Sequence, residues 1–274
     1  MSSDLQDKAR ILLDLHGIGK ILVLPNAWDA GSARIFEKAG FPAIATTSAG
    51  VAFTYGKPDG QRINAAEMLA VVQRIAETVK VPVTADVEAG YGDIAGTVHR
   101  VLEAGAVGMN LEDVEGDGSA GLIPLAEQVE RVKAARAAAD AAGVHVVLNA
   151  RTDVFLAAIG RPEDRLALTI ERIRAYAEAG ADSLFVPAVK EEDVIRALVQ
   201  AVPKPINILA NAGVPSTERL RALGVRRVST GSGPSRAALS VAQAVADQLL
   251  STGEYSVFTE CSLSYPAANK LFAE

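Results

Sequence analysis

The sequence predicts an α/β fold, a (β/α)₈ barrel followed by a helical extension at the C-terminus. Short apolar runs rich in β-branched residues recur eight times, and stretches with helical periodicity separate them. Five of these runs begin directly after an Ala-Gly or Leu-Gly pair, which is typical of a helix that ends on a left-handed glycine. An open doubly wound sheet seldom needs eight evenly spaced units, so these observations favour a closed barrel.

The predicted strands follow one another along the chain as short buried runs. They cover residues 21–25, 43–48, 81–86, 107–112, 144–150, 183–187, 205–210 and 225–230. The glycines at the five joints are Gly40, Gly105, Gly143, Gly180 and Gly224. Helical periodicity is found at residues 64–79, 124–142, 163–179, 191–202 and 234–250. We therefore expect residues 1–250 to form the barrel domain.

The last 24 residues, 251–274, have no strand or helix left to supply to the barrel. Within them, residues 266–272 predict a short helix. This helix would pack on the same barrel or on a neighbouring subunit.

Composition excludes several function classes. The chain has 274 residues, a net charge of −6 and a pI near 5.3, so it lacks a basic field for nucleic acid or an anionic membrane surface. Its single cysteine, Cys261, cannot form an internal disulfide. The N-terminal residues do not resemble a signal peptide, and no apolar stretch approaches a membrane span. We expect a cytoplasmic protein whose partner is a small molecule.

Three acidic side chains lie at the ends of two neighbouring predicted strands, where barrel enzymes carry their chemistry. Alternation along a strand predicts that Asp86 and Glu88 project the same way, and Glu112 ends the next strand. Three converging carboxylates without nearby His or Cys favour Mg²⁺, or Mn²⁺, over zinc. The alternative is that each carboxylate caps a following helix or pairs with a surface arginine.

Two further features belong to the same end of the barrel. Arg151 has the planar fork that binds a carboxylate or phosphate, although an internal ion pair with Glu112 or Asp153 is the alternative. Small residues, Thr47, Ser48 and Ala49, follow the second predicted strand. Their backbone N–H groups predict a cradle for a substrate carboxylate, and a simple tight turn is the alternative.

Several of these segments resemble one family. The runs PNAWDAGSAR (25–34), DVEAGYG (86–92), LED (111–113), NARTD (149–153) and LAN (209–211) are similar, in the same order, to motifs of the isocitrate lyase/phosphoenolpyruvate mutase superfamily. The resemblance spans residues 25–233. Its most specific parts are the 86–92 and 149–153 segments.

The resemblance implies a barrel enzyme that acts on a 2-oxo acid, a 2-hydroxy acid or a phosphonate relative. It implies a homotetramer, a dimer of dimers in which a C-terminal helix is exchanged between subunits. It also implies Mg²⁺ held mostly through waters by Asp86, Glu88 and Glu112. The substrate-binding residues that it implies are Thr47, Ser48, Ala49, Asp59, Arg151 and Asn211.

This chain departs from the superfamily's named branches in the loop after the fourth predicted strand. The lyases of the family carry a Lys-Lys/Arg-Cys-Gly-His loop there, and the phosphonate enzymes use Lys with Asn or Thr. Residues 114–123 here read VEGDGSAGLI, without Cys, His, Lys, Asn or Thr. Ala188 also replaces the Glu or His that follows the sixth strand in those branches.

We therefore expect a Mg²⁺-dependent carbon–carbon lyase or decarboxylase. Its substrate would be a small 2-oxo or 2-hydroxy di- or tricarboxylic acid that reacts through a pyruvate-enolate-like intermediate. The catalytic candidates are Arg151 and Glu112, with Tyr91, Glu115, Ser119 or water delivering the proton. The alternatives are a phosphonate enzyme, such as a carboxyphosphonoenolpyruvate or phosphoenolpyruvate mutase, and a catalytically silent barrel that binds a dicarboxylate.

Overall fold

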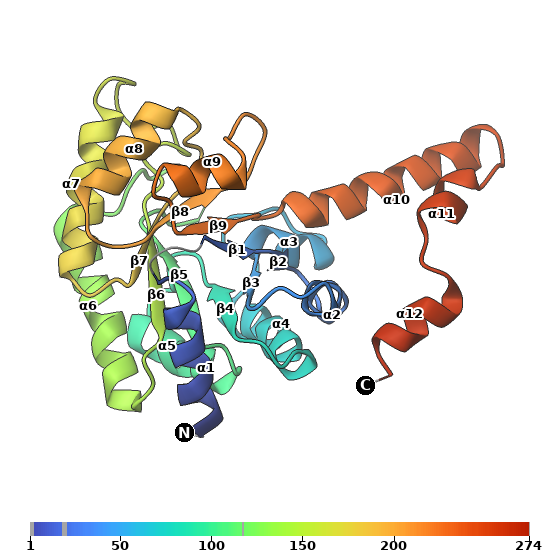
Figure 1. Ribbon diagram of the computed structural model, residues 1–274, viewed down its shortest axis with the longest axis horizontal. Coiled ribbons are helices and arrows are strands. Elements are labelled where there is room, and N and C mark those ends of the chain that lie inside the picture. Colours follow the sequence, from blue (N-terminus) through green and yellow to red (C-terminus); the bar gives the residue numbers. More distant parts are fainter. Residues whose placement is uncertain (1–2, 18–20, 117, 274) are drawn as a thin grey trace.

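A computed structural model describes residues 3–17, 21–116 and 118–273 (Figure 1). Its parallel strands form one nearly closed barrel, in the order β1-β9-β8-β7-β6-β5-β4-β3-β2. The strands are β1 (Leu22–Leu24), β2 (Asn26–Ala27), β3 (Ile44–Thr46), β4 (Val83–Asp86), β5 (Gly108–Glu112), β6 (Val147–Arg151), β7 (Ser183–Val186), β8 (Ile206–Leu209) and β9 (Arg227–Ser229). The predicted barrel is confirmed, and each predicted strand overlaps an observed one, with β6 ending one residue later than predicted, at Arg151.

The first predicted strand, residues 21–25, contains β1, and a second short strand, β2, follows Pro25 beyond the predicted end. β1 pairs with β9, and β2 pairs with β3, so the two ends of the sheet are consecutive pieces of chain. Proline has no N–H to donate, which interrupts the ladder at this point. The side chain of Asn26 joins the two sides, because it donates to Thr46 O at 2.6 Å and accepts from Thr230 N at 2.8 Å.

Helices surround the strands as predicted. They are α2 (Ala30–Lys38), α3 (Ser48–Thr54), α4 (Ala65–Thr78), α5 (Ile94–Glu103), α6 (Leu125–Ala142), α7 (Arg165–Glu178), α8 (Glu192–Ala201) and α9 (Thr217–Ala222). The five joint glycines all have positive φ, from 70° at Gly143 to 109° at Gly180. Among the described residues, no helix is both long and apolar enough to cross a membrane.

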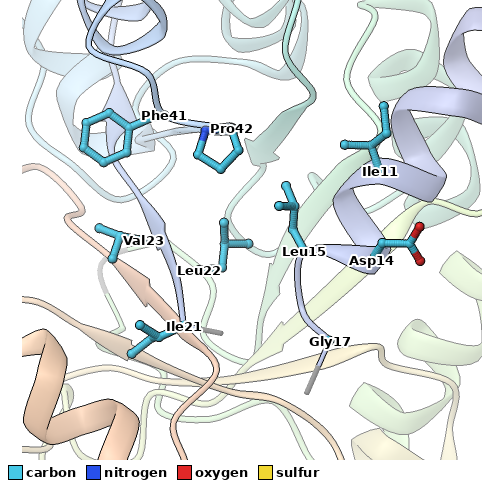
Figure 2. A pocket seen from close by; sticks show the side chains of 9 residues that line it. All are labelled: Ile11, Asp14, Leu15, Gly17, Ile21, Leu22, Val23, Phe41 and Pro42. Carbon is cyan, nitrogen blue, oxygen red and sulfur yellow. The ribbon is translucent and has the colours of Figure 1, made fainter. Parts of the chain in front are cut away.

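An additional helix, α1 (Ser3–Asp14), lies at the N-terminal end of the barrel. Its Leu12 is fully buried, and a Cβ added at Gly108 would lie 2.8 Å from Leu12 Cδ2, so Gly108 leaves room for this side chain. A cavity of about 700 Å³ lies beside α1, β1 and Pro42 (Figure 2). Mostly apolar side chains line it.

The C-terminal segment extends away from the barrel (Figure 1). It comprises α10 (Gly233–Ser251), α11 (Ser256–Cys261) and α12 (Tyr265–Leu271), of which α12 is the predicted short helix. Only Ser235 of α10 is buried, so the chain leaves the barrel at the start of this helix. α12 returns to contact α2. The exchange of this segment between subunits stays a prediction.

Candidate active site

A cavity of about 320 Å³ opens at the C-terminal ends of β4, β5 and β6. The loops that follow these strands form its wall, together with the loop after α3. The lining residues are Asp59, Gly60, Glu88, Glu112, Val114, Gly116, Gly118, Arg151, Asp153, Leu156 and Ala157. Most of the predicted acidic residues and Arg151 therefore meet at one place.

Asp86 is the last residue of β4 and lies beneath this cavity, where both of its oxygens are contacted. Oδ2 accepts from Ser48 N at 3.0 Å and from Ser48 Oγ at 2.9 Å. Oδ1 faces the Asn110 amide nitrogen at 3.5 Å. The first turn of α3 is thus directed at Asp86, because Ser48 is the first residue of that helix and Thr47 caps it.

The predicted carboxylate cradle, Thr47, Ser48 and Ala49, is buried, and the structure does not place it in the wall of the 320 Å³ cavity as described. Thr47 Oγ1 accepts from Gly50 N, and the Ser48 N–H is directed at Asp86. These residues form the capped start of α3, so the simple tight turn is wrong, and binding of a substrate carboxylate by their backbone stays a prediction.

Glu88 reaches the cavity by a route that strand alternation does not predict. The strand ends at Asp86, and Glu88 has φ of 51°, in the left-handed region that costs energy for a residue with a Cβ. The prediction that Asp86 and Glu88 share a strand face was therefore wrong. Glu88 accepts from Tyr91 Oη at 2.8 Å and from Gln61 N at 2.6 Å.

Burial sets the charge state of the Glu88–Tyr91 pair. Loss of solvation raises the pKa of Glu88 to about 7, and the nearby Asp86 charge adds to this while the hydrogen bonds from Tyr91 and Gln61 oppose it. Burial and the Glu88 charge raise the pKa of Tyr91 well above its usual range. Tyr91 is therefore a hydrogen-bond donor at neutral pH, and Glu88 can gain or lose a proton there.

Arg151, at the end of β6, lies between two carboxylates. Its Nη1 is 3.0 Å from Glu112 Oε1 and its Nε is 2.6 Å from Asp153 Oδ1, so both of the predicted internal ion pairs are present. The guanidinium also lies 5.5 Å from the Phe185 ring centroid. Burial raises the pKa of Glu112, and Arg151 opposes that shift.

The carboxylates fit a hydrated divalent ion better than a closed ligand cage. Across the described ranges, no three His, Cys, Asp or Glu side chains come close enough to enclose a metal ion directly. Asp86, Glu88 and Glu112 nevertheless offer hard oxygen donors around one cavity, and Arg151 is the only cation in its described wall. Mg²⁺ retains several waters when proteins bind it, so this donor set suits Mg²⁺ held largely through water.

The remaining predicted site residues lie outside the cavity or at its edge. Asp59 is in its wall, in an exposed loop. The Glu115 side chain is 57% exposed and 3.0 Å from Arg131 Nη1. Asn211 is exposed and accepts from the neighbouring Ala212 N. Ser119 is exposed on the 114–123 loop, and Asp117 in that loop lies outside the described residues.

A buried network supports the site, and it has no signal in the sequence. Asp113 Oδ2 accepts from Arg172 Nη1 at 2.9 Å and from Tyr176 Oη at 2.8 Å, and its Oδ1 accepts from Asp153 N at 2.9 Å. Arg172 also donates to Ile123 O at 2.6 Å. The network thus fixes the backbone beside Arg151 and one end of the 114–123 loop.

Known proteins resemble this chain over most of its length. A family model described as phosphoenolpyruvate phosphomutase matches residues 12–250. The uncharacterized protein Rv1998c of Mycobacterium tuberculosis (strain H37Rv) is 35% identical over 88% of this chain and 89% of its own. A 2-methylisocitrate lyase of Escherichia coli K12 is 33% identical over 72% of this chain and 69% of its own. An oxaloacetate decarboxylase of Pseudomonas entomophila is 31% identical over 80% and 76%.

Solved structures agree with these relatives. A Burkholderia cenocepacia J2315 protein described as a lyase/mutase has a TM-score of 0.92 at 36% identity and covers 100% of this chain and 98% of its own. A phosphonopyruvate hydrolase, solved with oxalate and Mg²⁺, has a TM-score of 0.83 at 25% identity, over 96% and 94%. The resemblance inferred from the motifs is confirmed: the chain belongs to the phosphoenolpyruvate phosphomutase family, within the isocitrate lyase/PEP mutase superfamily.

Proposed function

We propose that the protein is a Mg²⁺-dependent carbon–carbon lyase that acts on a small 2-oxo or 2-hydroxy di- or tricarboxylic acid. The observation that carries the proposal is the 320 Å³ cavity, where Glu88, Glu112 and Arg151 meet above Asp86. The relatives named as a 2-methylisocitrate lyase and an oxaloacetate decarboxylase support the carbon–carbon lyase class.

Asp86, Glu88 and Glu112 would hold the metal. When bound, Mg²⁺ would act as a Lewis acid toward the oxygens of a 2-oxo acid, as metal ions do in other enzymes. The carboxylates themselves are buried at low exposure, from 6% at Glu88 to 8% at Glu112, so their charge is poorly screened by solvent. Such a site binds a divalent cation strongly relative to an exposed cluster.

Arg151 would bind and stabilise the oxygen on which negative charge develops. Asp153 already orients the guanidinium, because it contacts Nε and Nη2. Nη1, which faces Glu112, is then the nitrogen that would donate to a substrate oxygen. A fixed guanidinium does not have to reorganise as charge develops, so it lowers the barrier more than a mobile cation would.

Tyr91 is the proton donor that we assign. Tyr91 Oη donates to Glu88 Oε2 at 2.8 Å, so its hydroxyl is held beside the proposed metal-binding carboxylates. A hydroxyl fixed at this place can deliver a proton to a substrate atom in the cavity. Glu115 is directed at Arg131 and has no comparable position.

The charge of the cavity favours the lyase over a phosphonate enzyme. In the wall that the structure describes, Arg151 faces four carboxylates, those of Asp59, Glu88, Glu112 and Asp153. Phosphonopyruvate carries up to three negative charges, against two on a 2-oxo dicarboxylate such as oxaloacetate, and phosphate sites usually collect several cations. A wall with one described cation therefore suits the dicarboxylate better.

We also propose that the protein is a cytoplasmic homo-oligomer assembled through its C-terminal segment. Leu250 is 88% exposed and Tyr265 is 84% exposed on that segment, which is unusual for large apolar side chains outside an interface. A single cysteine in 274 residues supports a reducing compartment.

The test is a substrate panel followed by proton and phosphorus NMR. The full-length protein is incubated with Mg²⁺ and, separately, oxaloacetate, methylisocitrate, dimethylmalate or phosphonopyruvate, each with and without EDTA. We expect metal-dependent pyruvate formation from one of the carboxylic acids, and its loss in Glu112→Gln. Conversion of phosphonopyruvate alone would overturn the lyase in favour of phosphonate chemistry.

A further inference from the structure

The interior of this barrel is unusually polar beneath the candidate active site. Barrel interiors are generally filled by Val, Ile and Leu. Here the fully or almost fully buried side chains include those of Asn110, Asn149, Ser183, Asn207, Arg227 and Ser229. Buried polar groups are costly unless they are paired, so their arrangement calls for an explanation.

Three hydrogen bonds connect four adjacent strands across this interior. Ser183 Oγ donates to Asn149 Oδ1 at 2.6 Å, and Asn149 Nδ2 donates to Asn110 Oδ1 at 2.7 Å. Asn110 Nδ2 then faces Asp86 Oδ1 at 3.5 Å. The chain of bonds runs from β7 through β6 and β5 to β4 and ends on the proposed metal-binding carboxylate.

Charged groups on two sides of Asn110 fix the orientation of its amide. Arg227 is always a donor, and its Nη2 lies 3.5 Å from Asn110 Oδ1. An ionised Asp86 is only an acceptor. Asn110 can satisfy both neighbours in one orientation of its amide, with the oxygen toward Arg227 and Asn149 and the nitrogen toward Asp86.

We propose that Asn110, oriented by Asn149 and Arg227, is a positioning residue that fixes Asp86 for metal binding. The inference rests on the proposed function, in which Asp86 is a metal ligand. Ser48 holds the other carboxylate oxygen through two hydrogen bonds, so Asp86 is supported on both sides. Partners that orient a ligand in this way generally contribute 10- to 100-fold to metal affinity.

The barrel contains a matched pair that lacks the connection. Asn207 and Ser229 are buried on the neighbouring strands β8 and β9 and hydrogen-bond to each other at 3.3 Å. Their composition matches Asn149 and Ser183, but no hydrogen bond within the described residues links them to Asn110 or Asp86. Variants of Asn207 or Ser229 are therefore matched controls. They remove a buried polar side chain but leave the hydrogen bonds to Asp86 in place.

The test compares Mn²⁺ binding, followed by electron paramagnetic resonance, in the full-length protein, Asn149→Leu and Asn207→Leu. Asn149→Leu should raise the Mn²⁺ dissociation constant about 10-fold or more, while Asn207→Leu should leave it unchanged. Equal effects in the two variants, whether large or absent, would overturn the inference. Absence of Mn²⁺ binding by the wild-type protein would instead overturn the proposed function.

A second pair of variants covers the case in which Asn149→Leu does not fold. Ser183→Ala removes only the first donor of the chain, and Ser229→Ala is its control. The Mg²⁺ concentration that gives half-maximal rate should rise in Ser183→Ala, with the rate at saturating Mg²⁺ retained. A general loss of folding would instead lower the amplitude of the thermal melt in both serine variants, and equal Mg²⁺ dependence in both would overturn the inference.

Discussion

The two ends of the barrel carry cavities that differ in size and in chemistry. The N-terminal cavity is the larger, about 700 Å³, and Asp14 is the one ionisable residue in its described wall. The C-terminal cavity is about 320 Å³ and brings five charged side chains together. Figure 2 shows the apolar residues Ile21, Leu22, Val23 and Phe41 around the former.

Convergent charge, and not volume, marks the proposed reaction site in this barrel. An apolar cavity costs the fold little beyond lost packing contacts. Several carboxylates around one small cavity repel one another and lose solvation, so such an arrangement persists where a ligand or reaction uses it. The direction of the strands agrees, because barrel enzymes place their chemistry at the C-terminal ends of the strands and their stability at the other end.

The largest effect on this comparison should come from Arg151→Lys. Lysine keeps the charge but cannot contact Asp153 and a substrate oxygen with a planar fork. We expect turnover to fall about 100- to 1,000-fold, measured as pyruvate release with Mg²⁺. The matched variant Asp14→Asn, in the N-terminal cavity, should keep wild-type turnover. A comparable loss in Asp14→Asn would show that the larger cavity takes part in the reaction.

The opposite end should dominate stability. Leu12→Ala removes a fully buried side chain of α1 that packs against Gly108. We expect the free energy of unfolding to fall by about 3 kcal/mol, with turnover per folded molecule unchanged. Urea unfolding measures the first quantity. Leu156→Ala is the control, because Leu156 lines the C-terminal cavity but is 48% exposed. A Leu12→Ala variant as stable as wild type would contradict the role of α1.

The sequence predicted most of the barrel and the main charged residues of its C-terminal cavity, Glu88, Glu112 and Arg151. The joint glycines and apolar runs are local signals, so the eight strand positions follow from them. Strand β2, after Pro25, was not predicted, because pairing switches there from β9 to β3 and that switch depends on closure of the whole barrel. Helix α1 was not predicted, although Leu5, Ala9 and Leu12 recur in it at helical spacing and two of them, Ala9 and Leu12, are buried.

The polar interior was not predictable in the same way. Barrel strands are buried on both faces, so a run such as residues 147–151 does not indicate which side chains face the axis. The pairing of Asn110 with Asn149 and the contacts of Arg172 with Asp113 join residues 39 and 59 positions apart. Glu88 reaches the cavity through a left-handed backbone conformation that follows the end of the strand.

The pH dependence of stability should separate the two ends. At the N-terminal end, burial first and Arg227 second lower the pKa of His16 to about 4, from 6.5. The unfolded chain therefore binds more protons than the folded protein between pH 6.5 and 4. The free energy of unfolding falls by about 3 kcal/mol as pH falls through this range. At the mouth, the Glu88 pKa is about 7 instead of 4.5, so the metal-free folded protein binds more protons and loses about 3 kcal/mol as pH rises.

Removing either group should move the slope of stability against pH in the opposite direction. In EDTA, between pH 4.5 and 6.5, His16→Gln removes a contribution that rises with pH, so its slope should be more negative than that of wild type. Glu88→Gln removes a contribution that falls with pH, so its slope should be more positive than that of wild type. Other buried carboxylates with a raised pKa, such as Glu112, contribute equally to all three proteins. Urea unfolding across this range measures the slopes, and His99→Gln, an exposed position on α5, should retain the wild-type profile. A change of slope in the same direction in both variants would contradict the assignment.

The smallest effect should come from Glu115→Gln. This variant distinguishes residues that line the C-terminal cavity from nearby residues that do not. Glu115 is 57% exposed and paired with Arg131, an interaction worth about 0–1 kcal/mol at a surface. Turnover should stay within about 5-fold of wild type, since less than 1 kcal/mol in a barrier gives no more. Tyr91→Phe, which removes the donor to Glu88, should lower turnover more, by about 100-fold. If the two variants reversed this order, the loop after β5 would have to close over the substrate and bring Glu115 into the reaction.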